Sequence, residues 1–447
     1  MRNLTSKVKM MMALVGVAAS AAQATGHSPQ TRIANLPEIA ASNLRFIENS
    51  QVKKADGVYV PGEWRTQVHS SPVAVILGIG DFLKGEEEPS AFTTSTMINQ
   101  LVSLYKDHPE FTQIPPMIAR ALPSVERFRE GVLYNFYPAT IWRGVRVHQA
   151  ATMTLSPIWI GDTNVPEDAD TTSVTYTAKY YNAQLTGKKF EVPRGVLKSF
   201  ATYRDLKREP HYYNADQRMY NTGAFLTWQM NEKDPRMPRF WFAQPEEGVR
   251  IPFNDNDVDC VVNINILKML ALTGNSRLKG RDKACGVLGY VVNSQDYAKC
   301  GIYYPNTYNF HYSASLMDAA GETCLRPYAD KMVAFILKNR DADGGWFNHD
   351  NYHVDDRVHA TAFAMLGLAH FGQPGDARVR QALASGSKFL MSRVKQSQAG
   401  NLYWEGEVFF TATAIARSLI DWKNDAFTTT VVLSALLKAD KVLATQP

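Results

Sequence analysis

The chain of 447 residues lacks the features that mark several large classes of protein. After the first 25 residues, no apolar run approaches the roughly 18 residues that a membrane-spanning helix requires. Charged residues form only 20% of the chain, and no stripe of Lys and Arg indicates a nucleic-acid surface. The net charge of +5 is small, and Arg2, Lys7 and Lys9 near the N-terminus supply three of those charges. We therefore expect neither a transmembrane anchor nor a nucleic-acid partner.

The first 24 residues have the pattern of a secretory signal. Basic residues precede the apolar run MMMALVGVAASAA, and Ala22-Gln23-Ala24 forms a small-residue cleavage site. No Cys follows the predicted cut, which disfavours a lipoprotein anchor. The pattern predicts a periplasmic or secreted protein.

Cysteine is scarce, and the four that are present lie in one stretch of the chain: Cys260, Cys285, Cys300 and Cys324. In an oxidising compartment an even, clustered set favours two disulfides over free buried thiols. Three pairings are possible, and the sequence does not choose among them.

Long runs rich in Ala, Thr, Ser and Leu recur from residue 90 onward, and each begins just after acids or His. A helix that carries few charges on any side is buried on all sides, so these runs predict inner helices. The strong runs begin at Ala91, Asp170, Cys260, His359 and Val408, and weaker ones begin at Asn221 and Phe310.

Amphipathic runs such as RPYADKMVAFILKNR lie between these inner helices, and each ends in a turn of Gly and aromatic residues. In the C-terminal half the inner runs recur about every 50 residues, which indicates a repeat array. The alternation of charge-poor runs with amphipathic runs predicts two concentric helical layers. We predict an all-α fold, an (α/α) toroid of about six helical hairpins, with the N-terminal ends of the inner helices at one mouth. The expected organisation is a signal (1–24), an N-terminal extension (25–89) and a toroid domain (90–447).

Carboxylates gather at the starts of three inner runs. Asp168 and Asp170 begin one run, and Asp257 and Asp259 begin another. The third run begins at His359, and acids precede it in the stretch HDNYHVDDRVHATAF. One Asp per helix is explained by N-capping and by the helix dipole. Capping does not explain two acids in DxD spacing, because neighbouring like charges raise each other's pKa.

Three kinds of chemistry suit these clusters. One Asp could act as a general acid in a low-dielectric cavity. Carboxylates could instead hold Ca²⁺ or Mg²⁺, or His with Asp or Cys could hold Zn²⁺. His359, at the start of a clean inner run, also fits a hydrogen-bonded core residue. The sequence leaves a divalent metal open and indicates no other cofactor.

The repeated hairpins and the turn DGGW, Asp343 to Trp346, resemble those of terpene cyclases and protein prenyltransferases, which are α/α toroids. PEDADTTS is similar to the DxDD motif of class II cyclases, whose middle Asp protonates an alkene. This resemblance implies Asp170 as the acid and Asp168 as its neighbour, with Thr171 in place of the last Asp. The helix that starts near His359 resembles the one that carries the zinc-binding His of prenyltransferases. Its metal partners follow D-x-C spacing, whereas Asp259 and Cys260 are adjacent here.

The first hypothesis is therefore an exported enzyme that acts on an apolar, terpenoid-like substrate by acid catalysis. The alternatives are a carbohydrate-active toroid, either lyase or hydrolase, and a non-catalytic binding protein. The partner is accordingly a small apolar molecule or a glycan, and the oligomeric state is open. The aromatic residues of the turns would bind substrate, or they would pack as structural wedges between helices. The candidate catalytic residues are Asp168, Asp170, Asp257, Asp259 and His359, and the candidate substrate-binding residues are Tyr303, Tyr304, Trp346, Asp356, Trp404 and Glu405.

Overall fold

A computed structural model describes most of the chain. The predicted signal, as well as His349, Asp350, His353 and Asp355, lies outside the described residues. The described ranges are 33–70, 85–150, 160–216, 218–240, 243–252, 255–348, 356–412 and 419–445.

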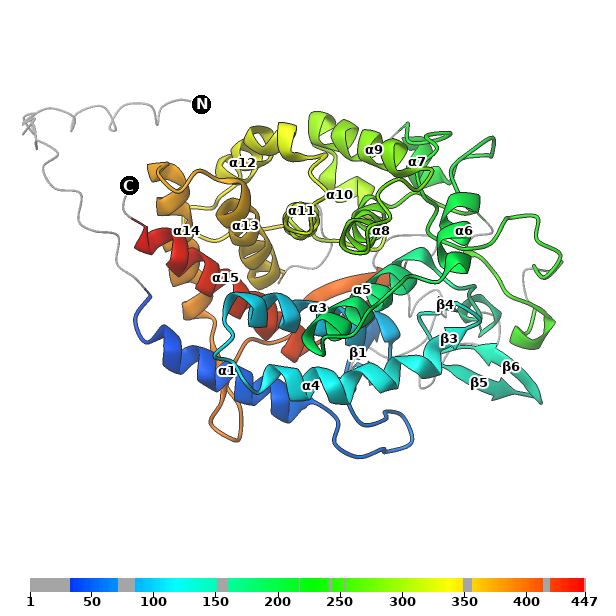
Figure 1. Cartoon of the computed structure of the whole chain (residues 1–447), viewed down its shortest axis with the longest axis horizontal. Helices are drawn as coiled ribbons and strands as arrows, with labels where there is room; N and C mark the ends of the chain where they lie inside the picture. The colour runs from blue at the N-terminus through cyan, green and yellow to red at the C-terminus, as the bar shows by residue number, and fades with distance from the viewer. Residues whose placement is uncertain are drawn as a thin grey trace, which may run out of the picture.

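Charge-poor helices form a closed inner ring (Figure 1). Each packs against the next along the chain, and the last returns to the first, which confirms the predicted α/α toroid. Buried side chains surround α5, α8 and α13 on nearly every side, as expected for a helix with no charged face. No described helix is long and apolar enough to cross a membrane. The inner helices are α3 (Ala91–Asp107), α5 (Ala169–Leu185), α8 (Cys260–Leu272), α11 (Asn309–Ala319), α13 (Arg357–Phe371) and α15 (Asp425–Ala444).

The outer helices are amphipathic and cover this ring. In α4, for example, Ile114, Met117, Ile118 and Ala121 are fully buried, and this helical spacing places them on the side facing the core. The first outer helix, α1, precedes residue 90 and packs against α15, so part of the predicted N-terminal extension joins the toroid wall. The outer helices are α1 (Leu36–Ser50), α4 (Ile114–Ala121), α6 (Arg194–Thr202), α9 (Arg281–Ser294), α12 (Ala329–Lys338) and α14 (Ala377–Ser392).

A small antiparallel sheet connects the two halves of the chain, in the order β2-β1-β10-β9. Strand β1 pairs with β10 so that Val68 lies opposite Trp422, and Trp422 in turn lies opposite Phe410 of β9. The strands are β1 (Gln67–Ser70), β2 (Glu86–Glu87), β9 (Val408–Ala412) and β10 (Ile420–Lys423). Other short elements are the hairpins β3 (Arg129–Glu130) with β4 (Leu133–Tyr134), β5 (Ala139–Trp142) with β6 (Val145–His148), and β7 (Lys395–Gln396) with β8 (Leu402–Tyr403), and the helices α7 (Tyr212–Asp216) and α10 (Tyr297–Cys300).

Two predicted inner helices are wrong. The run from Val408 forms β9, because its aromatic and β-branched residues enter the sheet, and the last inner helix begins instead at Asp425. The weaker run from Asn221 forms no helix. Its backbone instead pairs with neighbouring segments, for example where Trp228 bridges to Asp168.

The Gly-aromatic turns join outer helices to inner ones. The indole N–H of Trp346 donates to the carbonyl of Ile336 at 2.8 Å, near the end of α12. Its backbone N–H donates to the hydroxyl of Thr361 in α13 at 3.0 Å. Trp404 has an equivalent contact, an indole bond of 2.7 Å to the carbonyl of Leu390 in α14. Both indoles are fully buried, so each packs within the wall.

Candidate active site

Two of the four candidate aspartates cap inner helices. Asp168 is the N-cap of α5 and accepts from the backbone N–H of Thr171. Asp259 is the N-cap of α8 and accepts from the N–H groups of Val261 at 2.7 Å and Val262 at 3.0 Å. The capping explanation therefore accounts for these two residues. It does not account for Asp170 or Asp257, which are buried beside them.

Asp170 lies in the first turn of α5 and bonds to neighbouring segments. One carboxylate oxygen accepts from the amide of Asn265 at 2.8 Å, and the other accepts from the hydroxyl of Tyr304. Burial raises the pKa of Asp170 to about 6, while the bonds from Tyr304 and Asn265 pull it down. The carboxyl can therefore hold or release a proton close to neutral pH.

The neighbouring carboxyl of Asp168 is also shifted toward its protonated form. Burial, followed by the charge of Asp170, raises the pKa of Asp168 well above its usual range. Its oxygen Oδ2 is buried and has no hydrogen-bond partner among the described residues. Burial and the neighbouring carboxylate thus both favour the protonated form of Asp168.

Tyr303 links the two aspartates of the second DxD. Its hydroxyl donates to Asp257 at 2.6 Å, and its backbone N–H donates to Asp259 at 3.0 Å. The second oxygen of Asp257 accepts from the hydroxyl of Thr227. Burial, the largest effect, raises the pKa of Asp259 to about 7. The structure therefore brings all four predicted aspartates together with Tyr303 and Tyr304, and we call these six residues the acid cluster.

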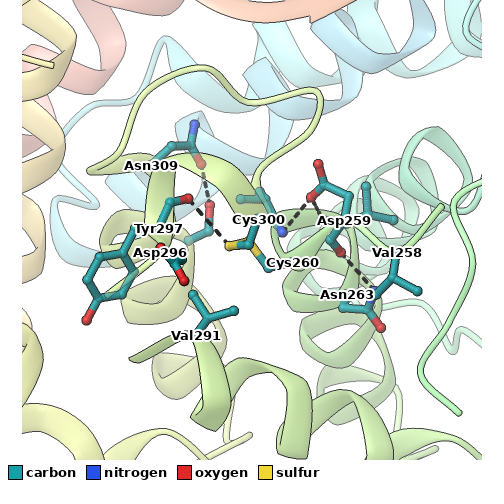
Figure 2. The surroundings of a disulfide bond; sticks show 12 residues. Val258, Asp259, Cys260, Asn263, Val291, Asp296, Tyr297, Cys300 and Asn309 are labelled. Carbon is teal, nitrogen blue, oxygen red and sulfur yellow. Dashed lines mark hydrogen bonds between the residues drawn. A yellow bond between two sulfur atoms is a disulfide. The ribbon is translucent and has the colours of Figure 1, made fainter. Parts of the chain in front are cut away.

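A disulfide ties the start of α8, where Asp257 and Asp259 lie, to the turn that carries the two tyrosines of the acid cluster. Cys260, which directly follows Asp259, is bonded to Cys300 (Figure 2). Cys300 lies just before the turn that carries Tyr303 and Tyr304. The second bridge joins Cys285 of α9 to Cys324. The expectation of two disulfides is confirmed, and the structure selects one of the three pairings.

An aromatic cluster covers the acid cluster and centres on Phe410 of β9. Phe410 stacks on Tyr303 with ring centroids 5.9 Å apart and meets Tyr304 edge-on at the same distance. Phe410 was not among the predicted site residues, because the run from Val408 was predicted to form a helix. The remaining rings around Phe410 are Phe92 at 5.1 Å, Phe136 at 5.0 Å and Trp422 at 5.5 Å.

His359 lies elsewhere in the wall, at the start of α13. Its Nδ1 is 3.3 Å from the carbonyl of Val408, and its Nε2 is 2.8 Å from the hydroxyl of Thr428. Burial lowers the pKa of His359 to about 4, so the ring is neutral at pH 7. None of the hydrogen bonds of this ring reaches the acid cluster, and its contacts are those of a satisfied core residue.

Asp356, His359 and Glu407 have potential ligand atoms within 4.8 Å of one another. Most of the polar atoms of these three residues are already engaged in hydrogen bonds. Glu407 accepts from three backbone N–H groups at the start of α13, including that of Val358 at 2.9 Å, and Asn306 donates to Asp356 at 2.7 Å. Both nitrogens of His359 also have partners, and Cys260 is in a disulfide. The residues present therefore do not fit the zinc site that the prenyltransferase resemblance implies.

Two predicted substrate-binding residues line a separate polar cleft of about 630 Å³. Asp356 and Glu405 face it, and Glu405 pairs with Lys395. No residue of the acid cluster lines this cleft. A substrate role for these two residues, and for the buried Trp346 and Trp404, stays a prediction.

The sequence also missed Asn265 and Lys268 of α8. Lys268 is the only charged residue of that helix and is 5% exposed. A lone charge in a helix buried on all sides is the signal that could have identified it.

Comparison of the sequence with protein-family models and with curated proteins gives no match. Among solved structures, the type II terpene cyclase MstE from Scytonema matches with a TM-score of 0.55 at 15% identity, over 91% of this chain and 98% of that one. A variant of MstE in complex with the substrate geranylgeranyl dihydroxybenzoate matches with the same score and identity, over 91% and 97%. Cellobiose 2-epimerase from Spirochaeta thermophila gives a TM-score of 0.45 at 11% identity, over 91% and 96%. The chain has the terpene cyclase-like α/α-toroid fold.

Proposed function

We propose that the protein is an exported single-toroid enzyme that acts on an apolar, terpenoid-like substrate by general-acid catalysis. The observation that carries this proposal is the Asp168–Asp170 pair at the start of α5. Both carboxyls are buried, both have raised pKa values, and Asp170 is oriented by Tyr304 and Asn265. Perturbed acids of this kind cluster at functional sites.

In this reaction Asp170 transfers its proton to a carbon of an alkene, and the other carbon of the double bond becomes a carbocation. The hydrogen bonds from Tyr304 and Asn265 stabilise the carboxylate that remains. Aromatic faces stabilise a nearby cation by about 0.5 to 2 kcal/mol each, and Phe410 and its neighbours would supply them. Attack of a second double bond of the substrate on the cation forms a carbon–carbon bond and closes a ring. Loss of a proton from the resulting cation completes an isomerisation, whereas addition of water, followed by loss of a proton from the added oxygen, completes a hydration.

Two further observations support the proposal. The fold is shared with a type II terpene cyclase over most of both chains. The paired cysteines favour an oxidising compartment, in agreement with the predicted signal.

A carbohydrate-active toroid is the second candidate, and one observation favours it. On the α3 face formed by Thr93, Thr96 and Gln100, polar atoms are buried without hydrogen-bond partners among the described residues. A polar ligand such as a sugar could satisfy them.

Asp170→Asn tests the first candidate. Incubation with a panel of linear isoprenoids, followed by mass spectrometry, should detect a cyclised or hydrated product with the unmodified chain. The variant should lose at least about 100-fold in rate, because general acids contribute on that scale. Its control is Asp376→Asn, which changes the partly exposed N-cap of the outer helix α14.

Folding stability gives the second readout of the same variant. Because the pKa of Asp170 is raised on folding, its stabilising contribution is complete below about pH 4 and is lost as the pH rises through about 6. At pH 8 the asparagine avoids that penalty, so the melting temperature should stay level or rise. Full turnover by Asp170→Asn would end the proposal. If incubation with a panel of polysaccharides gave a product, that result would favour the carbohydrate-active enzyme.

A further inference from the structure

The polar cleft opens at the same end of the ring as the acid cluster. Its walls come from β1, from the starts of α13 and α15, and from residues 403–408. Phe427 at the start of α15 stacks on Phe409, which in turn stacks on Phe92 of the aromatic cluster. The volume of the cleft, about 630 Å³, falls within the range of roughly 300 to 1,000 Å³ that holds small molecules.

The walls of this cleft are polar almost throughout. Among the described residues that line it, only Val358 and Val408 have aliphatic side chains. An apolar chain seated here would remove water from charged groups and give them no partner in return, which is costly. The cleft therefore does not suit the apolar substrate of the proposed reaction and calls for a polar ligand of its own.

Basic and acidic side chains line the cleft in equal number. Two arginines and two lysines face four carboxyls. Some of these charges are paired, as Lys395 is with Glu405, and as Arg357 is with Asp341 at 3.0 Å and with Asp343 at 2.7 Å. A ligand with a net charge of either sign would lie against like charges on one wall. The balance of charges favours an uncharged ligand.

Both donors and acceptors remain open on these walls. Lys423 is half-buried and makes no hydrogen bond or ion pair with any residue that the structure describes. The guanidinium of Arg393 lies 5.2 Å from the ring centroid of Phe389 and pairs with no acid in the described ranges. One oxygen of Asp425 accepts from the N–H of Gly406 at 2.6 Å, which leaves its second oxygen to accept from a ligand. A sugar hydroxyl both donates and accepts, so one class of neutral ligand can satisfy the ammonium and the carboxylate together.

Several side chains of the walls are held in place from behind. The ring of Tyr403 stacks on Phe46 with centroids 4.5 Å apart. Three backbone N–H groups at the start of α13 fix Glu407, and Arg357 makes two hydrogen bonds to Asp343, at 2.7 and 2.8 Å. Groups that are ordered before a ligand arrives lose little freedom when it binds. The ring of Tyr403 also offers an aromatic surface to the apolar C–H face of a pyranose.

We propose that this cleft binds an uncharged saccharide at a site separate from the acid cluster. Lys423 and Arg393 donate to the oxygens of the sugar, Asp425 accepts from its hydroxyls, and Tyr403 packs against its ring. This binding goes beyond the proposed function and does not depend on it, because no residue of the acid cluster lines the cleft. The saccharide is bound here and is not cleaved by Asp170.

Isothermal titration calorimetry with five disaccharides tests the site. Three probes are neutral (maltose, lactose and mannobiose), digalacturonate is anionic, and the glucosamine dimer is cationic. The unmodified protein should bind at least one neutral disaccharide at least about tenfold more tightly than either charged one. Lys423→Met should weaken that binding by at least about tenfold, as expected for the loss of a hydrogen bond from a charged group, and Lys423→Arg should retain most of it. Lys438→Met is the matched control, since Lys438 is a half-buried lysine of α15 that lies 4.0 Å from Asp107 and does not line the cleft.

If the unmodified protein bound none of the neutral disaccharides, the inference would be wrong, and this comparison requires no variant to fold. Equal or tighter binding of a charged disaccharide would overturn the assignment to an uncharged ligand. Undiminished binding by Lys423→Met would show that the sugar does not occupy this cleft. Binding that is kept in Lys423→Met and lost in Asp170→Asn would place the sugar inside the ring and would also overturn the inference. Full isoprenoid turnover by Asp170→Asn, by contrast, would refute the proposed catalysis and leave the saccharide site intact.

Discussion

The two disulfides offer a comparison in which stability and site geometry can be separated. The bridges span 40 and 39 residues, so the chain-entropy estimate gives each about 4 kcal/mol. For a protein of this length, that corresponds to a fall of about 5 °C in melting temperature. Replacing either pair with alanine should therefore destabilise the protein by a similar amount.

Only the Cys260–Cys300 bridge flanks the acid cluster. Without it, the turn that holds Tyr303 and Tyr304 is tied to α8 by hydrogen bonds alone, among them the bond from the backbone N–H of Tyr303 to Asp259. Hydrogen–deuterium exchange followed by mass spectrometry should show faster exchange in a peptide covering residues 301–305 when Cys260 and Cys300 are replaced. The pair Cys285 and Cys324 should leave that peptide unchanged. Equal exchange in the two double variants, at equal melting temperatures, would refute the view that the first bridge positions the tyrosines.

Two further substitutions test individual contacts. Tyr304→Phe removes a donor that lowers the pKa of Asp170, so activity that requires the protonated acid should persist to higher pH; a pH–rate profile that does not move contradicts this. Trp404→Ala removes a fully buried side chain and should cost about 3 to 5 kcal/mol in urea unfolding with no change in KM. A rise in KM at unchanged stability would instead support a substrate-binding role for Trp404.

The inner layer was predictable because burial on all sides excludes charge. The runs from Ala91, Asp170, Cys260 and His359 all lie within inner helices, and their acids stand at the helix starts. The run from Val408 is equally poor in charge and was predicted as a helix, but it forms a strand. A buried strand is as free of charge as a buried helix. Length and composition alone do not separate the two cases.

The candidate site was predictable only in part. Asp168 and Asp170 stood out by their spacing, and Tyr303 and Tyr304 by their place in a Gly-aromatic turn. Asn265 and Lys268 lie within a helix, and only the rotation of α8 against α5 places them beside Asp170. His359 stands at a helix start, yet both of its ring nitrogens are hydrogen-bonded to neighbouring residues, which its position in the sequence could not indicate.

Closure of the ring has a consequence for how the chain reaches its native state. The last inner helix, α15, packs against α1, α3 and α13, and Asp440 accepts a hydrogen bond from the backbone of Ile33, 407 residues away. Strand β1 likewise finds its partner β10 only near the C-terminus. During synthesis, the flanks of α3 and α13 stay exposed until the final helix emerges. The polypeptide must therefore be released almost whole before its core can form, and a chain that ends before Asp425 keeps an open, apolar seam.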